Sequence, residues 1–179
     1  MLGWDVTDFG SGDFMKRGLF LFTIRNGNLT GTSKKSYAEK IMIVRVDQET
    51  PMHFHRLKME DIINRGGGDL VMQVYNSKEN GEFDDSDVHL AMDGRQVTVK
   101  AGGTVILKPG QSVTLRPGQY HCWKAVNDKV MLFEVSSTND DNIDNRFHTA
   151  KGRFPTIEED VAPEYLIFRD YPQFIKLRG

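Results

Sequence analysis

The chain has 179 residues, of which 39% are hydrophobic and 10% aromatic, enough for one domain with a buried core. Its formal net charge is −2 and its basic residues form no block longer than pairs such as Lys34 and Lys35, which argues against nucleic acid or an anionic membrane as partner. A single cysteine, Cys122, excludes an internal disulfide and fits a reducing compartment, and no apolar run approaches the roughly 18–20 residues that span a bilayer, so we expect a cytoplasmic protein without a signal peptide.

Short β-rich runs separated by turn residues fill most of the sequence. Turn signals such as "NGE", "DGR", "AGG", "KPGQ" and "RPGQ" alternate with runs of Val, Ile, Leu and Thr. Runs of this kind at roughly 8- to 12-residue spacing predict an antiparallel sandwich or barrel. The expected strands are 19–25, 40–46, 60–65, 69–75, 88–93, 96–100, 104–108, 112–115, 121–126 and 129–137.

Helix signals are scarce. Only "TIEEDVAPEYL" (156–166) predicts a short helix, with Thr156 as its N-cap and acidic residues in the first turn. No low-complexity linker divides the chain. We therefore expect one barrel domain over 1–179, in which an N-terminal arm (1–18) and a C-terminal segment (150–179) pack on the barrel.

Four residues in two motifs indicate a metal site. In "PMHFHRLKMEDIINRGGG", His53 and His55 point to the same face of a strand, and Glu60 follows after a short connection that can return it beside them. His121, in "LRPGQYHCW", opens another β run after a Pro-Gly turn. The histidine pair alone fits a packed strand as well as a metal site. All four residues together favour a divalent metal, whereas the isolated His89 and His148 predict ordinary packing or solvation.

A glutamate interrupts an apolar strand in "VMLFEVSS". Glu134 shares a face with Val130 and Leu132, and the opposite face is apolar as well. A glutamate in such a run is rarely buried without a partner. An apolar setting would raise its pKa toward a value useful for proton transfer, while a nearby metal would oppose this. The alternative is a glutamate in water at the end of a strand.

Two further polar features have no role that their spacing alone defines. Lys58 lies between His55 and Glu60, where spacing predicts an ordinary surface lysine in a turn. The segment "NDDNIDNRF" (139–147) is too polar for a core and on its own predicts a solvated loop.

The two histidine motifs resemble those of the cupins. The match to the first motif comprises His53, His55, Glu60 and Gly67, and "RPGQYH" is similar to the second. The sequence departs from the general pattern where Asp47 replaces a glycine, where Pro117 and Gly118 are adjacent, and where Ala125 replaces an asparagine. All four ligand positions are nevertheless filled.

Longer segments are similar to one cupin family. "FTIRNGNLTG", "KSYAEKIMIVR", "ETPMHFHRLKMEDIINRGGG", "PGQYH" and "STNDDNIDNRF" together resemble the cupin-type D-lyxose isomerases, over roughly Trp4 to Asp160. The resemblance implies an all-β jelly-roll barrel with short peripheral helical segments. It also implies isomerisation of D-lyxose to D-xylulose, and more slowly of D-mannose to D-fructose, in a cytoplasmic homodimer that exposed barrel edges would help to form.

The resemblance also implies roles for individual residues. Lys58 belongs to the family motif, so we expect it to bind substrate and to share proton transfer with Glu134. Asp144 and Arg146 are expected to bind sugar hydroxyls at the barrel mouth. The four ligands suit Mn²⁺, Zn²⁺, Co²⁺ or Fe²⁺, and the resemblance favours Mn²⁺, which would act as a Lewis acid.

Two alternatives remain open. An iron-dependent cupin dioxygenase would use the same four ligands for a different reaction. A sugar-binding cupin without activity would regulate or store. Neither alternative needs Glu134 and Lys58 for proton transfer.

Overall fold

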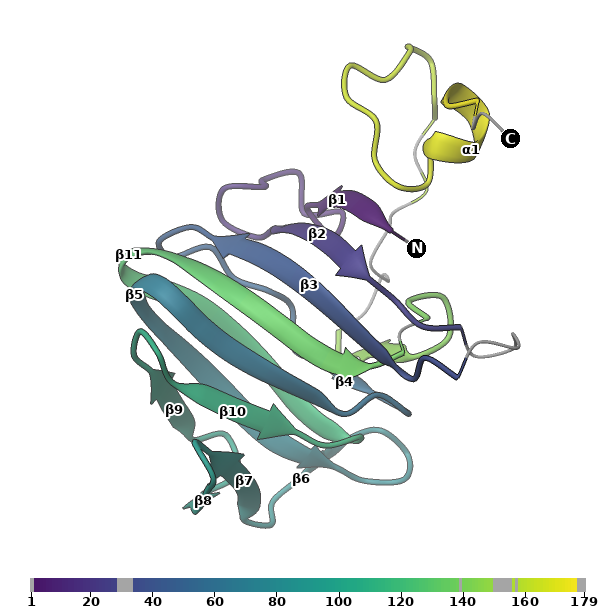
Figure 1. Cartoon of the computed structure of the whole chain (residues 1–179). Helices are drawn as coiled ribbons and strands as arrows, with labels where there is room; N and C mark the ends of the chain where they lie inside the picture. Colours follow the sequence, from purple (N-terminus) through teal and green to yellow (C-terminus); the bar gives the residue numbers. More distant parts are fainter. Residues whose placement is uncertain (1, 29–33, 139, 150–155, 157, 177–179) are drawn as a thin grey trace.

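A computed structural model describes residues 2–28, 34–138, 140–149, 156 and 158–176 of the chain. Nearly all regular structure in these residues is antiparallel β-sheet (Figure 1). The elements are β1 (Gly3–Thr7), β2 (Leu19–Arg25), β3 (Tyr37–Val44), β4 (His53–His55), β5 (Glu60–Ser77), β6 (Phe83–Asp84), β7 (Val88–Met92), β8 (Arg95–Val99), β9 (Thr104–Leu107), β10 (Ser112–Leu115), β11 (Gln119–Ser137), β12 (Asn145–Phe147) and α1 (Tyr171–Phe174).

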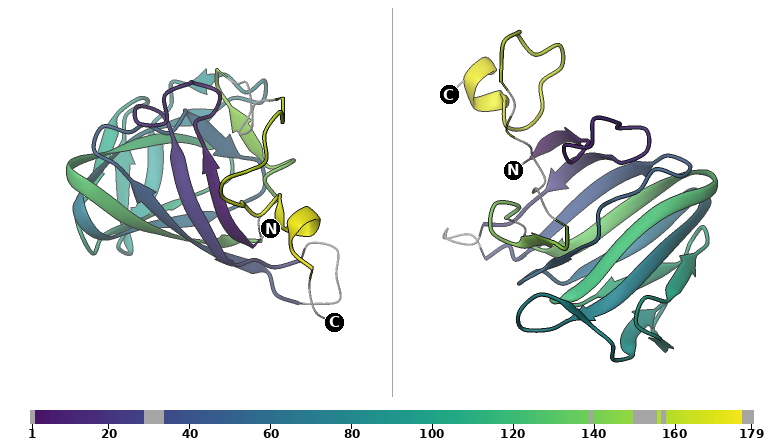
Figure 2. Two further views of the ribbon diagram at one scale, coloured as in Figure 1. Left: turned by 90° about the horizontal axis from the view of Figure 1, so that it is seen from above. Right: turned by 180° about the vertical axis from the view of Figure 1, so that it is seen from behind.

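Two long strands, β5 and β11, connect the two layers of the barrel. They pair with each other along most of their length. The first half of β5 and the second half of β11 belong to a layer with the order β1-β2-β3-β11-β5-β10-β7-β8. Their other halves pair with β4, β6 and β9, and β4 pairs with β12. Figures 1 and 2 show the resulting jelly-roll barrel.

Glycines let β5 bend from one layer to the other. The sequence predicts separate strands at 60–65 and 69–75 with a turn between them, but the structure has one continuous strand. Gly67 has a φ of 96°, in the left-handed region that favours glycine. A Cβ at this position would collide with the carbonyl of Lys129 on β11. The bend therefore needs glycine for both backbone conformation and space.

A bulge in β11 changes which residues face the interior. The expected strands 121–126 and 129–137 are also one strand, whose register with β5 shifts between Val126 and Val130. Before the shift the odd-numbered positions 119–125 are buried, and after it the even-numbered positions 130–136 are buried. The bulge thus turns Glu134 toward the same interior as His121.

The hydrophobic core fills the space between the layers. Alternating side chains supply it, because successive residues of a strand point to opposite faces. Its buried members include Leu21, Met42, Ile62, Leu70, Met72, Leu90, Leu107, Leu115, Trp123 and Leu132. The core occupies most of the barrel and leaves one end for polar residues.

The first and last described segments of the chain lie at the edge of the first layer. Within the expected N-terminal arm, β1 is an edge strand that pairs with β2. The amide of Phe168 donates to the carbonyl of Trp4 at 2.7 Å, so the described C-terminal residues lie beside β1 (Figure 2). No helix among the described residues is long and apolar enough to cross a membrane.

The helix predicted over 156–166 is wrong. The described residues of this range are irregular, and the described helix is α1, at Tyr171–Phe174. Pro163 disfavours helical backbone at Ala162, and 158–165 are all exposed, so no packing offsets this cost.

We expect Gly67→Ala to lower the free energy of unfolding more than Gly94→Ala does. Both glycines have positive φ, 96° and 77°, so a Cβ at either costs about 1–2 kcal/mol of backbone strain. At Gly94 it meets nothing within 4 Å, whereas at Gly67 it meets the Lys129 carbonyl, which adds about 1–3 kcal/mol. Urea unfolding followed by circular dichroism measures both losses. Equal losses would contradict the close contact at the bend.

Candidate metal and proton-transfer site

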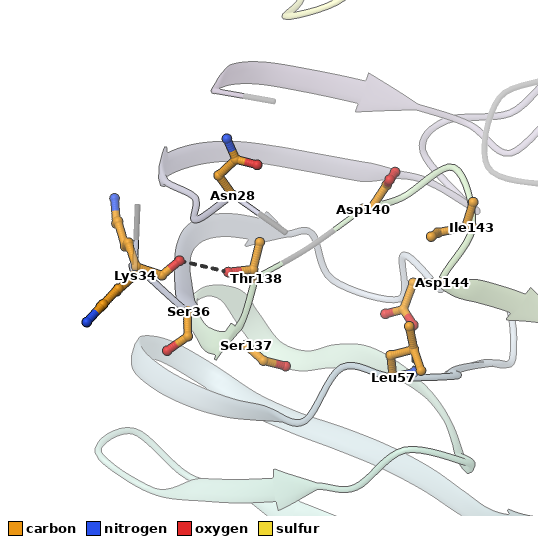
Figure 3. Close-up of a pocket in the computed structure, with 10 residues that line it drawn as sticks. Asn28, Lys34, Ser36, Leu57, Ser137, Thr138, Asp140, Ile143 and Asp144 are labelled. Atoms are coloured by element: carbon orange, nitrogen blue, oxygen red, sulfur yellow. Dashed lines mark hydrogen bonds between the residues drawn. The ribbon is translucent and has the colours of Figure 1, made fainter. Parts of the chain in front are cut away.

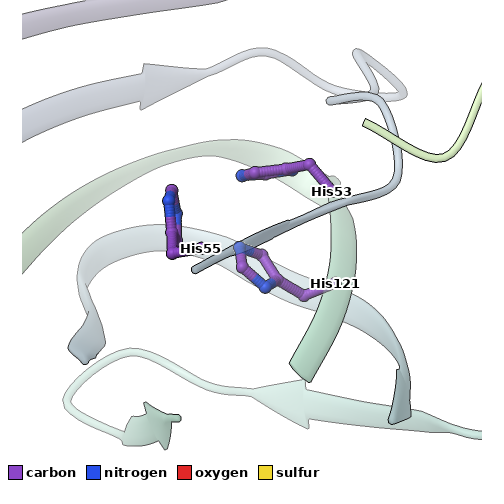
Figure 4. Close-up of side chains that lie close together, drawn as sticks. All are labelled: His53, His55 and His121. Atoms are coloured by element: carbon purple, nitrogen blue, oxygen red, sulfur yellow. The ribbon is translucent and has the colours of Figure 1, made fainter. Parts of the chain in front are cut away.

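Three histidines converge at one end of the barrel (Figure 4). His53 and His55 lie on β4, and His121 on β11 pairs in register with His53. One nitrogen from each ring lies within 4.8 Å of the other two. The predicted convergence of the two motifs is therefore present in the fold.

Backbone carbonyls orient two of the rings. The Nδ1 of His53 lies 2.8 Å from the carbonyl oxygen of Pro51, and the Nδ1 of His121 lies 3.0 Å from that of Gln119. A carbonyl only accepts, so Nδ1 is the donor in each ring and Nε2 is the atom that could bind a cation. Carbonyl partners of this kind are common behind metal-binding histidines.

A carboxylate completes the cluster. Glu60 opens β5 and is 2% exposed. Its Oε1 lies 3.1 Å from the Nε2 of His121 and its Oε2 lies 3.4 Å from the Nε2 of His55. Neither Glu60 Oε1 nor His121 Nε2 has a hydrogen-bond partner, although both are buried. Unpartnered nitrogen and oxygen atoms turned to one point fit the ligands of a divalent cation.

The protonation states of these groups also suit a cation. Burial, His121 and His55 hold the pKa of His53 well below its usual value, so this ring is neutral. Burial raises the pKa of Glu60, but Lys58 and His55 outweigh it and hold the carboxyl ionised. Burial and Lys58 lower the pKa of His55, but Glu60 and Asp144 outweigh them and raise it. A metal would therefore compete with a proton for His55.

Asp144 lies behind His55. Its Oδ2 is 3.5 Å from the Nδ1 of His55, and its Oδ1 accepts a hydrogen bond from the amide of Leu57 at 2.7 Å. The side chain is buried. In this position Asp144 lies against an imidazole, whereas the sequence predicts contact with sugar hydroxyls.

Arg146 is not brought to the histidines. It lies on β12 opposite Phe54, so it shares the face of Phe54, and it donates to the carbonyl of Asn80 at 3.1 Å. Its neighbours Asn145 and Phe147 pair with His55 and His53 and share their face.

Lys58 is buried and links two carboxylates. Its Nζ lies 2.6 Å from Glu60 and 2.8 Å from Glu134. The partner that the sequence requires for a buried Glu134 is therefore present. Spacing alone predicts a surface lysine here, and the structure instead follows the family motif.

Sequence reasoning missed a second buried lysine. The Nζ of Lys40, on β3, lies 3.3 Å from Glu134, whose Oε1 also accepts from Ser136 at 2.8 Å. The signal was available, because Lys40 shares the inward face of its strand with Met42 and Val44. A lysine in an apolar alternation needs a buried partner.

The pKa of Glu134 is lowered by two lysines, which the prediction from the sequence does not weigh against burial. Burial raises this pKa, but Lys40 and Lys58 outweigh burial and lower it. Burial lowers the pKa of Lys58, but Glu134 and Glu60 outweigh it and raise it. At neutral pH an ionised proton acceptor therefore lies beside a protonated donor.

A small cavity borders these groups. Its volume is about 40 Å³, and its lining includes His53, Lys58 and Glu134 together with Phe9 and Phe147. The two half-buried phenylalanine rings contact each other, with centroids 5.8 Å apart. The space is large enough for an ion and a water molecule.

A larger hollow, of about 450 Å³, lies on the other side of Asp144. Figure 3 shows Asp144 and Leu57 at one end of it and Lys34 at the other. No histidine lines it, so it is separate from the cluster.

The thiol is turned away from the cluster. Cys122 lies between His121 and Trp123 on β11, and alternation places it on the opposite face. Burial and Glu49 raise its pKa to about 11, so the thiol stays protonated at neutral pH.

Solved structures share this fold. The L-ribose isomerase of Cellulomonas parahominis, solved with L-psicose, matches with a TM-score of 0.62 and 16% identity over 84% of this chain and 83% of that one. The L-ribose isomerase of Geodermatophilus obscurus matches with a TM-score of 0.59 and 16% identity, with the same coverage. At these identities the likeness concerns the fold alone. The barrel is of the cupin type, as the sequence predicts.

Curated relatives are much more similar. The D-lyxose/D-mannose isomerases of Serratia proteamaculans and Escherichia coli O157:H7 are each 47% identical, over 97% of this chain and 78% of their own length. A family model described as D-lyxose isomerase matches residues 1–171. The chain belongs to the D-lyxose isomerase family and is a sugar isomerase that interconverts aldose and ketose forms. The predicted family and enzyme class are confirmed.

We expect His121→Ala to lose most bound divalent metal, whereas His89→Ala keeps it. The first variant removes an inward lone pair of the cluster, while His89 is exposed on β7. Metal analysis after dialysis against a trace of Mn²⁺ measures both. Full occupancy in His121→Ala would contradict its place among the ligands. Occupancy should also fall as the pH is lowered, because protonation of His55 competes with the metal.

Proposed function

We propose that the protein interconverts D-lyxose and D-xylulose, and D-mannose and D-fructose, with one divalent metal held by His53, His55, Glu60 and His121. The names of the two curated relatives support the choice of sugars. The observation that carries the mechanism is Lys58, which connects a ligand, Glu60, to Glu134 by contacts of 2.6 and 2.8 Å.

Glu134 is the proposed proton acceptor. An aldose becomes a ketose when the C2–H bond breaks, a hydrogen is added at C1, and the hydroxyl proton of O2 ends on O1. Glu134 is ionised and borders the cavity, so it can take the C2 proton and return it to C1. A divalent metal supplies a Lewis acid that stabilises negative charge on the sugar oxygens.

Lys58 is the proposed partner of Glu134. It is protonated and lies between the ligand carboxylate and the base, so it can donate to the oxygen on which charge grows. The same ammonium can pass the O2 proton toward O1. Asp144 would act through His55, and the position of Arg146 gives it no contact with these groups.

Mn²⁺ is the proposed ion. Three imidazoles and one carboxylate suit several first-row metals, so the ligand set is compatible with Zn²⁺, Co²⁺ and Fe²⁺ as well. The resemblance to metal-dependent isomerases favours Mn²⁺. Metal analysis of protein purified without chelator, followed by reconstitution with each ion, tests this choice.

We also propose a cytoplasmic homodimer with one barrel domain in each copy. The single cysteine supports a reducing compartment, since its thiol has no partner cysteine. The resemblance supports the dimer.

Replacement of Glu134 by glutamine separates binding from chemistry. Glu134→Gln keeps the size of the side chain but accepts no proton, so turnover of D-lyxose should fall by about 10²–10⁴. Metal content should stay near that of the wild type, because Glu134 is not among the ligands. Exchange of the C2 hydrogen with solvent deuterium should stop. Loss of metal would show that Glu134 supports the site, and near-normal turnover would move the base to Lys58.

The same assay in air and under argon tests the reaction class. Isomerisation needs no co-substrate, so the rates should agree with a redox-inert ion. Strict dependence on O₂ would favour the dioxygenase, and binding without turnover would favour a non-catalytic cupin.

Lys40 should set the acidic limit of activity. Lys40 helps to lower the pKa of Glu134, so Lys40→Met should raise that pKa. Only ionised Glu134 accepts a proton, and activity should therefore disappear at a higher pH than in the wild type as the pH falls. The control is Lys124→Met, at a half-buried lysine that is paired with Asp47 rather than Glu134. The pH dependence of kcat/KM measures the shift, and an unmoved acidic limb would contradict the role of Lys40.

A further inference from the structure

The outer face of the first layer is apolar across five strands. Trp4, Phe22, Ile41, Phe133 and Ile63 form one row, in which each residue is the register partner of the next. Directly paired residues of antiparallel strands share a face, so the row is continuous. We call this row and its neighbour the apolar face. The neighbouring row comprises Val6, Phe20, Ile43 and Met131.

Solvent reaches this face in the single chain. Trp4 is 44% exposed, and Val6 and Met131 are each 40% exposed. In Figure 1 the strands β2, β3, β11 and β5 lie in the foreground with the rest of the barrel behind them. A contiguous exposed patch of this kind marks an interaction site more often than single exposed residues do.

The size of the apolar face suits a protein interface. Five strands about 4.8 Å apart span roughly 24 Å, and the two apolar rows together with the charged positions at their ends cover six to seven residues at about 3.3 Å each, so this surface has a projected area on the order of 500 Å². Side-chain relief adds to the projected area, and a standard interface takes about 800 Å² from each partner. The face is therefore large enough to be the core of such an interface.

Charges of opposite sign flank the apolar face at its two ends. At one end Arg25 neutralises Glu39 at 3.0 Å, so the net negative charge of this acidic end comes from Asp61. At the other end three cations point outward, Arg45, Lys129 and Arg65, and the last lies over the ring of Phe133. A copy stacked with like ends together would oppose the cations. A copy turned end for end would place each acidic end over a basic end.

A hollow at the basic end is suited to a partner. Its volume is about 400 Å³, and it is lined by Met15, Ile43, Arg45, Val46, Asp128 and Lys129. Met15 and Val46 are exposed apolar residues at its rim. When two copies are stacked end for end, the acidic end of each lies over the hollow of the other.

We propose that the apolar face is the interface of the homodimer, with a second copy packed face to face. The two-fold axis runs across the strands along the row of Ile41, Phe133 and Ile63, so that each strand lies antiparallel to its own copy. The proposal rests on the homodimer proposed above and names its surface and orientation. Ile41 and Phe133 are then covered by the partner, next to the inward Lys40 and Glu134 of the same strands.

Sedimentation velocity of the full chain tests the surface. Ile41→Glu places a charge in the centre of the face, so the dimer dissociation constant should rise at least about 100-fold. Ile106→Glu is the matched control, because Ile106 is 51% exposed on β9 outside the face, and it should stay dimeric. A wild-type chain that is monomeric would overturn both the face and the homodimer. A dimeric Ile41→Glu with native circular dichroism would overturn the face alone.

An exchange of charges tests the orientation and does not depend on Ile41→Glu folding. Asp61 and Arg65 lie four residues apart on β5, on either side of the proposed axis. Asp61→Arg and Arg65→Glu should each weaken the dimer about 10-fold or more, and the double variant should restore it. A double variant weaker than both single variants would overturn the end-for-end arrangement. Lyxose turnover is measured separately, so failure of the isomerase proposal would be distinguished from failure of the surface.

Discussion

The contacts from Lys58 to Glu60 and Glu134 are the interaction on which the site depends. Two carboxylates this close repel each other when both are buried and ionised. One ammonium between them, with Lys40 beside Glu134, balances the charges. Removing one member of such a buried ion cluster leaves an uncompensated charge, which lowers the free energy of unfolding by about 3–5 kcal/mol. The same contacts join Glu60, a proposed metal ligand, to Glu134, the proposed proton acceptor, so neither part is set independently.

Local spacing was sufficient to predict that His53, His55, Glu60 and His121 lie together. His53 and His55 share a face in any strand, and the connection to Glu60 is too short to carry it far. The position of His121 could be predicted from a turn that is followed by a strand. These positions follow from the period of a strand and from turn chemistry, which the sequence displays directly.

Residues whose surroundings come from distant strands were harder to predict. The pairing of Asp144 with His55 depends on the register of β12 with β4, and the same register turns Arg146 away. The pKa of Glu134 depends on Lys40, which arrives from β3. The helix expected near Pro163 lacked a packing partner. In each case tertiary contacts, which spacing does not contain, decided the outcome.

The bulge in β11 limits the insertions and deletions that the chain can accept. His121 and Glu134 are 13 positions apart, an odd number, and an unbroken strand would point them to opposite faces. The irregular segment 126–130 shifts the alternation of inward and outward side chains by one residue, so both His121 and Glu134 point inward. Deletion or insertion of one residue there would turn Glu134 to the outside and bring Phe133 or Val135 into the charged cluster. An insertion of two would keep the parity. The length of an exposed bend far from the ligands is therefore constrained in steps of two by the chemistry at the other end of the strand.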